Sequence, residues 1–145
     1  MRSKPVLTSE DAAAILVAAK TEALENMWSV AIVVVDDGGH PLALERMNGC
    51  APIGAYIAQE KARSAALGRR DTKVYEDMVN GGRFAFVGAP CITPLEGGVL
   101  LKVGNEVIGA IGVSGVLPAQ DAQIARAVCT ALHAPGDSEL LQAAG

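Results

Sequence analysis

The sequence has few aromatic residues, no surplus of positive charge and no long hydrophobic run. One tryptophan, two tyrosines and two phenylalanines among 145 residues leave aliphatic side chains and alanine to form the core. Twelve Lys and Arg against 16 Asp and Glu give a net charge of -4, whereas nucleic-acid-binding proteins usually carry a basic surplus on one face. No window reaches the roughly 18 consecutive apolar residues of a membrane span. We therefore expect neither a nucleic-acid partner nor a membrane partner.

The three cysteines, Cys50, Cys91 and Cys129, are widely spaced and include no Cys-x-x-Cys pair. Such a set fits free thiols better than disulfides or a zinc site. The first residues lack the apolar segment of a secretion signal, which predicts a cytoplasmic protein. A chain of this length is expected to form one domain, over residues 1–145.

Four segments carry the signals of helices. Thr8 or Ser9 can supply the hydroxyl cap of a helix that has acidic residues in its first turn, Pro52 suits the first turn of another, and Asp71 can cap a third. Alanines recur at helical spacing after Pro52, so that helix can lie close to a neighbouring element. We expect helices at 9–26, 52–68, 72–79 and 118–133.

Two pairs of strands are each joined by a glycine-containing turn. The β-branched run at 30–35 predicts a strand buried on both faces, followed by a tight turn and a return strand at 41–47. Gly104 and Asn105 join a second pair, at 98–103 and 106–113. The segment 80–98 is rich in glycine and proline, and we expect an ordered loop with one short strand there. This order of elements predicts an α+β fold with an antiparallel sheet.

Charged residues near the first hairpin are candidates for a catalytic site, because phosphate-loop, hydrolase-elbow and zinc-protease motifs are absent. Asp36 ends the buried strand, Arg46 lies on the return strand and Lys61 lies in mid-helix. Arg46 or Lys61 would hold the carboxylate of a small organic acid, and Asp36 would act as general acid or base if burial raised its pKa. Alternatively, the two cations simply pair at the surface with Asp36, Glu45 or Glu60.

The glycine-rich segment 109–115 is a second candidate site. Glycines within a strand mark a bulge, or a place where another backbone or a ligand comes close. Ser114 and Gly115 precede a helix and could present backbone N–H groups to an anion, although close packing of a helix on the sheet explains the glycines equally well. His40 follows two turn glycines, and it is either an exposed turn residue or a metal ligand. His133 lies near a helix end, where a cation complements the helix dipole.

The order of the motifs is more specific than any one of them. The segments VVVDDGGHPLALERMNGC, QEKARSAA and EGGVLLKVGNEVIGAIGVSG are followed by an Asp-x-x-Ile-Ala helix at 121–125. Over about residues 9–133 this series resembles the GlcG/HbpS family, also called the haem-degrading or DUF336 domain, which is also the C-terminal domain type of some corrinoid adenosyltransferases. The resemblance implies a five-stranded antiparallel sheet flanked by helices, related to profilin-like and PAS-like sandwiches. It also implies a homo-oligomer, as a dimer, tetramer or octamer.

The resemblance further implies a small-ligand-binding protein, with haem or a related tetrapyrrole as the ligand and no other cofactor. The family positions carried over by motif are Asp36, Gly39, Arg46, Met47, Lys61, Gly112, Ser114 and Gly115. His40 completes the ligand-binding set as the candidate metal ligand, ahead of Met47 and Cys50. Asn48 stands where the family usually has Asp.

Two other functions stay open. One is a cofactor-free isomerase, lyase or hydrolase that acts on a small organic acid through Asp36, Arg46 and Lys61. The other is a non-catalytic oligomeric accessory or sensor module.

Overall fold

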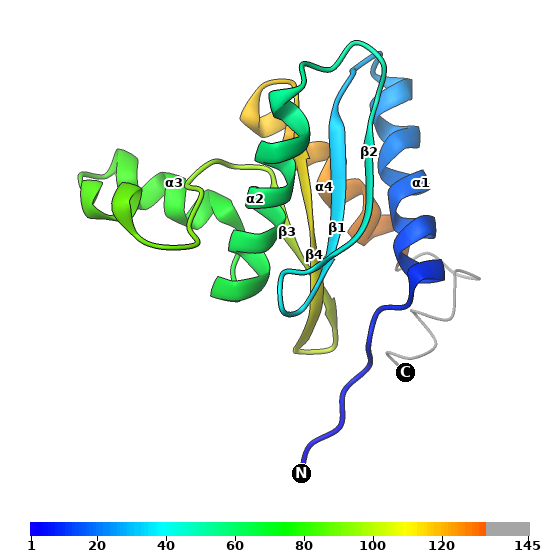
Figure 1. Ribbon diagram of the computed structural model, residues 1–145, viewed down its shortest axis with the longest axis horizontal. Helices are drawn as coiled ribbons and strands as arrows, with labels where there is room; N and C mark the ends of the chain where they lie inside the picture. Colours follow the sequence, from blue (N-terminus) through cyan, green and yellow to red (C-terminus); the bar gives the residue numbers. More distant parts are fainter. Residues whose placement is uncertain (133–145) are drawn as a thin grey trace.

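The computed structural model describes residues 1–132, which fold into four α-helices, a 3-10 helix and one sheet (Figure 1). The elements follow the order expected from the sequence. They are α1 (Ser9–Glu25), β1 (Ala31–Asp36), β2 (Pro41–Arg46), α2 (Ile53–Gly68), α3 (Thr72–Asn80), η1 (Phe84–Gly88), β3 (Gly98–Val103), β4 (Glu106–Ser114) and α4 (Pro118–Leu132).

The sheet is antiparallel throughout, with the strand order β2-β1-β4-β3. The α+β class and both predicted hairpins are therefore confirmed. The described residues form four strands, not the five that the family resemblance implies. Where a short strand was expected within 80–98, the chain forms the 3-10 helix η1, which has no buried residue and no strand partner.

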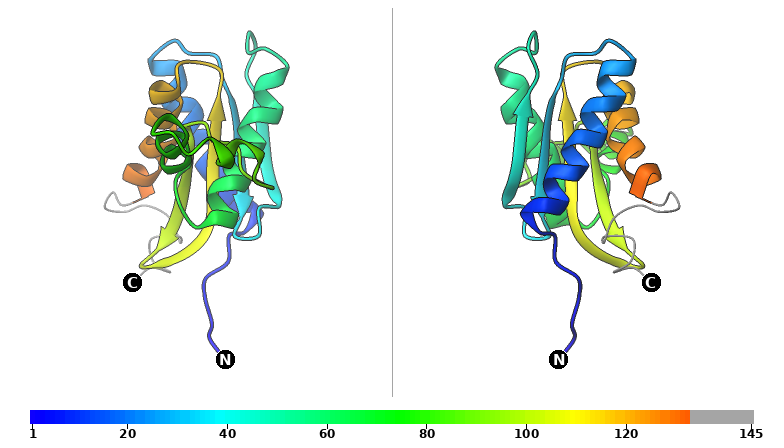
Figure 2. Two further views of the ribbon diagram at one scale, coloured as in Figure 1. Left: turned by 90° about the vertical axis from the view of Figure 1, so that its left-hand side faces the viewer. Right: turned by 90° about the vertical axis from the view of Figure 1, so that its right-hand side faces the viewer.

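Helices cover both faces of the sheet (Figure 2). Side chains alternate along β1, so Ile32 and Val34 join the core cluster under α1 and α4, while Val33 and Val35 join the cluster under α2. The predicted alanine stripe lets α2 lie close to the sheet, with Ala58, Ala62 and Ala65 fully buried. None of the described helices is long and apolar enough to cross a membrane.

The helix ends agree with the sequence signals except at Asp71. Thr8 and Asp11 form a capping box, with Thr8 Oγ1 accepting from Asp11 N at 3.1 Å. Asp71 occupies the N-cap position of α3, but its carboxylate accepts from Leu100 N at 3.0 Å. Thr72 Oγ1 accepts from Gly98 N at 2.9 Å. The start of α3 thus satisfies backbone groups of β3, and the rest of α3 projects from the body together with η1 (Figure 1).

Candidate functional site

The first hairpin turns around the carboxylate of Asp36. Gly39 N donates to Asp36 O at 3.0 Å, which closes a tight turn. Asp36 Oδ1 accepts from Gly38 N and from His40 N, both at 2.9 Å. Gly39 has a φ of +78°, and a Cβ there would lie 2.9 Å from Arg63 Cγ of α2. Glycine at this position therefore allows both the left-handed backbone and the contact of the turn with α2.

His40 points its imidazole outward from this turn. Its side chain is 79% exposed, and its Nδ1 lies 3.1 and 3.2 Å from the two carboxylate oxygens of Asp36. A carboxylate oxygen accepts hydrogen bonds, so in the neutral imidazole this contact places the hydrogen on Nδ1 and the lone pair on Nε2. A histidine held in this way is oriented to bind a metal ion through Nε2.

The structure does not bring Asp36, Arg46 and Lys61 together. Ala31 pairs with Arg46, whereas Asp36 lies at the other end of β1. Five residues of strand separate those ends by about 17 Å. The acid and the cation of the proposed organic-acid site therefore face different ends of the hairpin.

Lys61 makes a buried ion pair that crosses from α2 to α4. Its Nζ donates to Asp121 Oδ2 at 3.0 Å and to Val113 O at 2.9 Å, and both charged side chains are 3% exposed. A Cβ on Gly97, whose φ is +132°, would lie 2.8 Å from Nζ, so glycine leaves the space for the ammonium. Burial raises the pKa of Asp121, partly offset by the charge of Lys61. The partner of Lys61 is thus neither Asp36, Glu45 nor Glu60.

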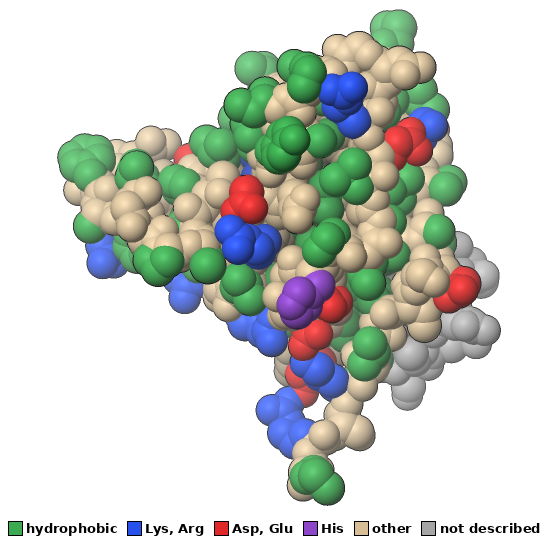
Figure 3. All heavy atoms as spheres, viewed as in Figure 1, with side chains coloured by type: hydrophobic (Ala, Val, Ile, Leu, Met, Phe, Trp, Pro, Cys, Tyr) green, Lys and Arg blue, Asp and Glu red, His purple; other side chains and the backbone are tan. Residues whose placement is uncertain are grey.

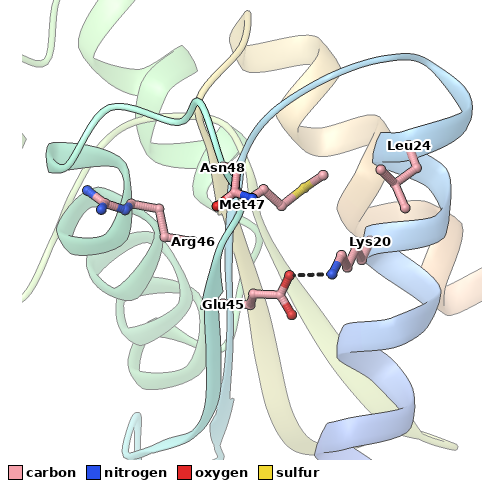
Figure 4. Close-up of a pocket in the computed structure, with 6 residues that line it drawn as sticks. All are labelled: Lys20, Leu24, Glu45, Arg46, Met47 and Asn48. Carbon is pink, nitrogen blue, oxygen red and sulfur yellow. Dashed lines mark ion pairs between the residues drawn. The ribbon is translucent and has the colours of Figure 1, made fainter.

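Arg46 lies at the exposed rim of a surface hollow of about 400 Å³ (Figure 4). Its side chain points toward α2, while that of Glu45 points toward α1 and pairs with Lys20 at 2.7 Å. Among residues 1–132, no acidic side chain forms an ion pair with Arg46. Its guanidinium is therefore available to an anion from outside this described part of the chain.

The two sulfur-containing candidates for a metal ligand are buried. Met47 is 8% exposed and packs in the core cluster under α1 and α4. Cys50 is also 8% exposed and packs against α2, and burial raises the pKa of its thiol. The imidazole of His40 is therefore open to solvent, whereas these two side chains face the interior.

The glycine-rich end of β4 serves packing. A Cβ on Gly112 would lie 2.0 Å from Ala58 O, and one on Gly115 would lie 2.8 Å from Ser29 O. Ser114 is 8% exposed. The backbone N–H of Val116 donates to Asp121 Oδ1 at 3.2 Å. The anion that accepts from the backbone between β4 and α4 is thus the carboxylate of the protein's own Asp121.

Asp121 and Gly97 are the residues that sequence reasoning missed. In the sequence, Asp121 stands out only as part of the Asp-x-x-Ile-Ala motif, and Gly97 only as part of a glycine-rich loop. The signal was Lys61 itself, because an ammonium beside an alanine stripe needs a buried anion. No group of three His, Cys, Asp or Glu side chains within 1–132 is arranged to hold a metal ion, so a metal bound by several side chains has no site there.

The comparisons with known proteins agree with this fold. The chain matches the family described as haem degrading protein HbpS-like over residues 7–130. It is 61% identical to protein GlcG of Escherichia coli K12 over 114 residues, which are 79% of this chain and 85% of GlcG. The crystal structure of HbpS has a TM-score of 0.83 at 26% identity, covering 92% of this chain and 95% of HbpS. The PduOC:heme complex has a TM-score of 0.79 at 25% identity, covering 89% and 96%. This chain therefore belongs to the family described as haem degrading protein HbpS-like.

Proposed function

We propose that the protein binds haem or a related tetrapyrrole at the first hairpin, with His40 as the iron ligand. The observation that carries this proposal is the exposed imidazole of His40, whose Nδ1 is held by Asp36. The likeness to PduOC, which was solved as a heme complex, supports the choice of ligand.

The residues around the turn fit an iron porphyrin. Imidazole nitrogen is a common axial ligand of haem iron, and bound haem would supply redox or small-ligand chemistry at that iron. The flat ring also needs an apolar surface, and Leu67 of α2 is 45% exposed beside the turn, with its Cγ 3.5 Å from the position of a Cβ on Gly39. Exposed Pro41 continues this surface on β2.

Three residues of the turn have distinct roles in this proposal. His40 binds the iron through Nε2, and Asp36 fixes the tautomer of the ring and raises the basicity of Nε2. Gly39 keeps the turn close to α2, in contact range of Leu67. Arg46 lies at the far end of the hairpin and takes no part in iron binding.

The test is a titration of the purified protein with haemin, followed by its Soret absorption. Wild type should shift the Soret band and saturate at one haemin per chain. His40→Ala should remove the shift, because Met47 and Cys50 are buried.

The matched control is His133→Ala, which removes the only other histidine of the sequence. This variant should titrate like wild type. An unchanged spectrum of wild type at stoichiometric haemin, or an unchanged shift in His40→Ala, would reject the proposal.

A further inference from the structure

The sequence contains two Asn-Gly steps, Asn48–Gly49 and Asn80–Gly81. In such a step the backbone nitrogen of the glycine can attack the side-chain amide of the asparagine, because glycine has no side chain to shield that nitrogen. The reaction needs an accessible asparagine and a glycine nitrogen that is free to approach it. Both asparagines and both glycines are exposed. The conformation and hydrogen bonds of the backbone therefore decide which step can react.

Asn48 and Gly49 are the two central residues of a tight turn that follows β2. Cys50 N donates to Met47 O at 3.2 Å, which closes the turn. Gly49 has a φ of +89°. Within residues 1–132, the N–H of Gly49 donates no hydrogen bond. The attacking nitrogen of this step is therefore free.

The second step is held in a helix. Asn80 is the last residue of α3, and Gly81 N donates to Asp77 O at 2.8 Å. This hydrogen bond aims the N–H of Gly81 along the helix axis at the carbonyl of the preceding turn. Attack on the Asn80 amide requires that the nitrogen first lose this bond. The same dipeptide is thus free at one place and restrained at the other.

We propose that Asn48 is a site of spontaneous deamidation and that α3 protects Asn80. In this reaction Gly49 N loses its proton and bonds to Asn48 Cγ, while the bond from Cγ to Nδ2 breaks and the nitrogen leaves as ammonia. Water then opens the cyclic imide at either of its two carbonyl groups, which gives aspartate or isoaspartate. The net change exchanges one amide for one carboxylate, consumes one water and needs no oxidant or reductant.

The new carboxylate would change the charge of the hollow beside β2. Asn48 and Arg46 both line this hollow, and its other charged residues, Lys20 and Glu45, pair with each other at 2.7 Å (Figure 4). On the face shown in Figure 3, several cationic side chains lie next to acidic ones. Arg46 has no acidic ion-pair partner among residues 1–132. Deamidation of Asn48 therefore cancels the net positive charge of the hollow.

The test follows both steps in one sample of the folded protein, kept in mildly alkaline buffer. Trypsin cleaves after Lys and Arg, which places Asn48 in peptide 47–61 and Asn80 in peptide 74–83. Mass spectrometry gives the deamidated fraction of each peptide over time. Asn48 should be converted roughly 2–10 times faster than Asn80, the factor that corresponds to one backbone hydrogen bond. In protein unfolded by guanidinium chloride the two rates should become equal.

The matched variants are Asn48→Gln and Asn80→Gln, which keep the amide but move it one methylene further from the backbone. The acidic form that accumulates in wild type, resolved by ion-exchange chromatography, should be absent from Asn48→Gln and present in Asn80→Gln. Asn48→Asp should elute with that form. The inference would be overturned by equal rates of the two steps in folded protein, by faster conversion of Asn80, or by no conversion of Asn48.

Discussion

Asp36 and His40 act as one unit, because a single carboxylate both shapes the turn and orients the imidazole. Asp36 Oδ1 receives two backbone N–H groups as well as the ring nitrogen of His40. The Asp36 side chain is 28% exposed, while His40 stays open to solvent. The same hydrogen bonds that stabilise the hairpin therefore leave one nitrogen ready for a metal.

Asp36→Asn should weaken haemin binding by about 10–100-fold, the range typical for loss of a carboxylate behind a ligating histidine. The amide oxygen can still accept from Gly38 N and His40 N, so the turn should persist. The measurement is the dissociation constant from absorbance titration.

Asp37→Asn is the matched control, because it makes the same charge change in the same turn. Asp37 pairs with Lys4 and Arg69 instead of His40. Equal losses of affinity in the two variants would contradict the role given to Asp36.

At the scale of single residues, the sequence indicates which side chains are unusual better than it indicates which side chains they contact. His40 and Asp36 are four positions apart across a tight turn, so their contact is local. The separation of Asp36 from Arg46 could also have been deduced, because a tight turn fixes the register of a hairpin. The pairing of Lys61 with Asp121 could not, because the two residues lie on different helices, on opposite sides of the sheet.

At the scale of elements, this ion pair links the two helical layers at one end of the sheet. Lys61→Met should lower the free energy of unfolding by about 3–5 kcal/mol, because it leaves Asp121 buried without a counter-charge. Urea denaturation measures this loss. The control is Lys73→Met, which removes an exposed surface pair with Asp77 and should change the free energy of unfolding far less, because solvent screens that pair. Similar losses of unfolding free energy in both variants would contradict the claim that burial makes the Lys61–Asp121 pair important.

The deficit of Lys61→Met should depend on pH. Burial already raises the pKa of Asp121 above the ordinary value of 3.8, and loss of the ammonium should raise it further. A carboxyl with a raised folded-state pKa contributes stability that is present below its unfolded pKa and is lost as pH rises through the folded pKa. The difference between wild type and variant should therefore shrink as pH falls toward 3.8. A difference that stays constant or grows in acid would contradict this account.

The elements themselves were predicted well where local chemistry decides them. Helix caps, β-branched runs and glycine turns placed four helices and four strands within two residues of their observed ends. The segment 80–98 was wrongly expected to contain one short strand, and its residues Phe84–Gly88 form the 3-10 helix η1 instead. A strand also needs a neighbouring strand as hydrogen-bond partner. At the outer edge of β3, however, the N–H of Gly98 donates to Thr72 Oγ1 and the N–H of Leu100 donates to Asp71 Oδ1.

At the scale of the whole molecule, the proposed haem site and the exposed apolar side chains at the start of α2 lie apart. His40 and Leu67 lie by the first hairpin, whereas Ile53 and Tyr56 lie at the other end of α2. The homo-oligomer implied by the family resemblance stays a prediction. Periodicity cannot test it, because residues that face a partner and residues that face a core have the same spacing.

Native mass spectrometry of the protein mixed with one equivalent of haemin per chain tests the central claim most directly, because it reports ligand and assembly together. The account predicts assemblies of two or more chains with one haem per chain, and the same assemblies without haem for His40→Ala. Single chains without haem, or haem retained equally by His40→Ala, would contradict it.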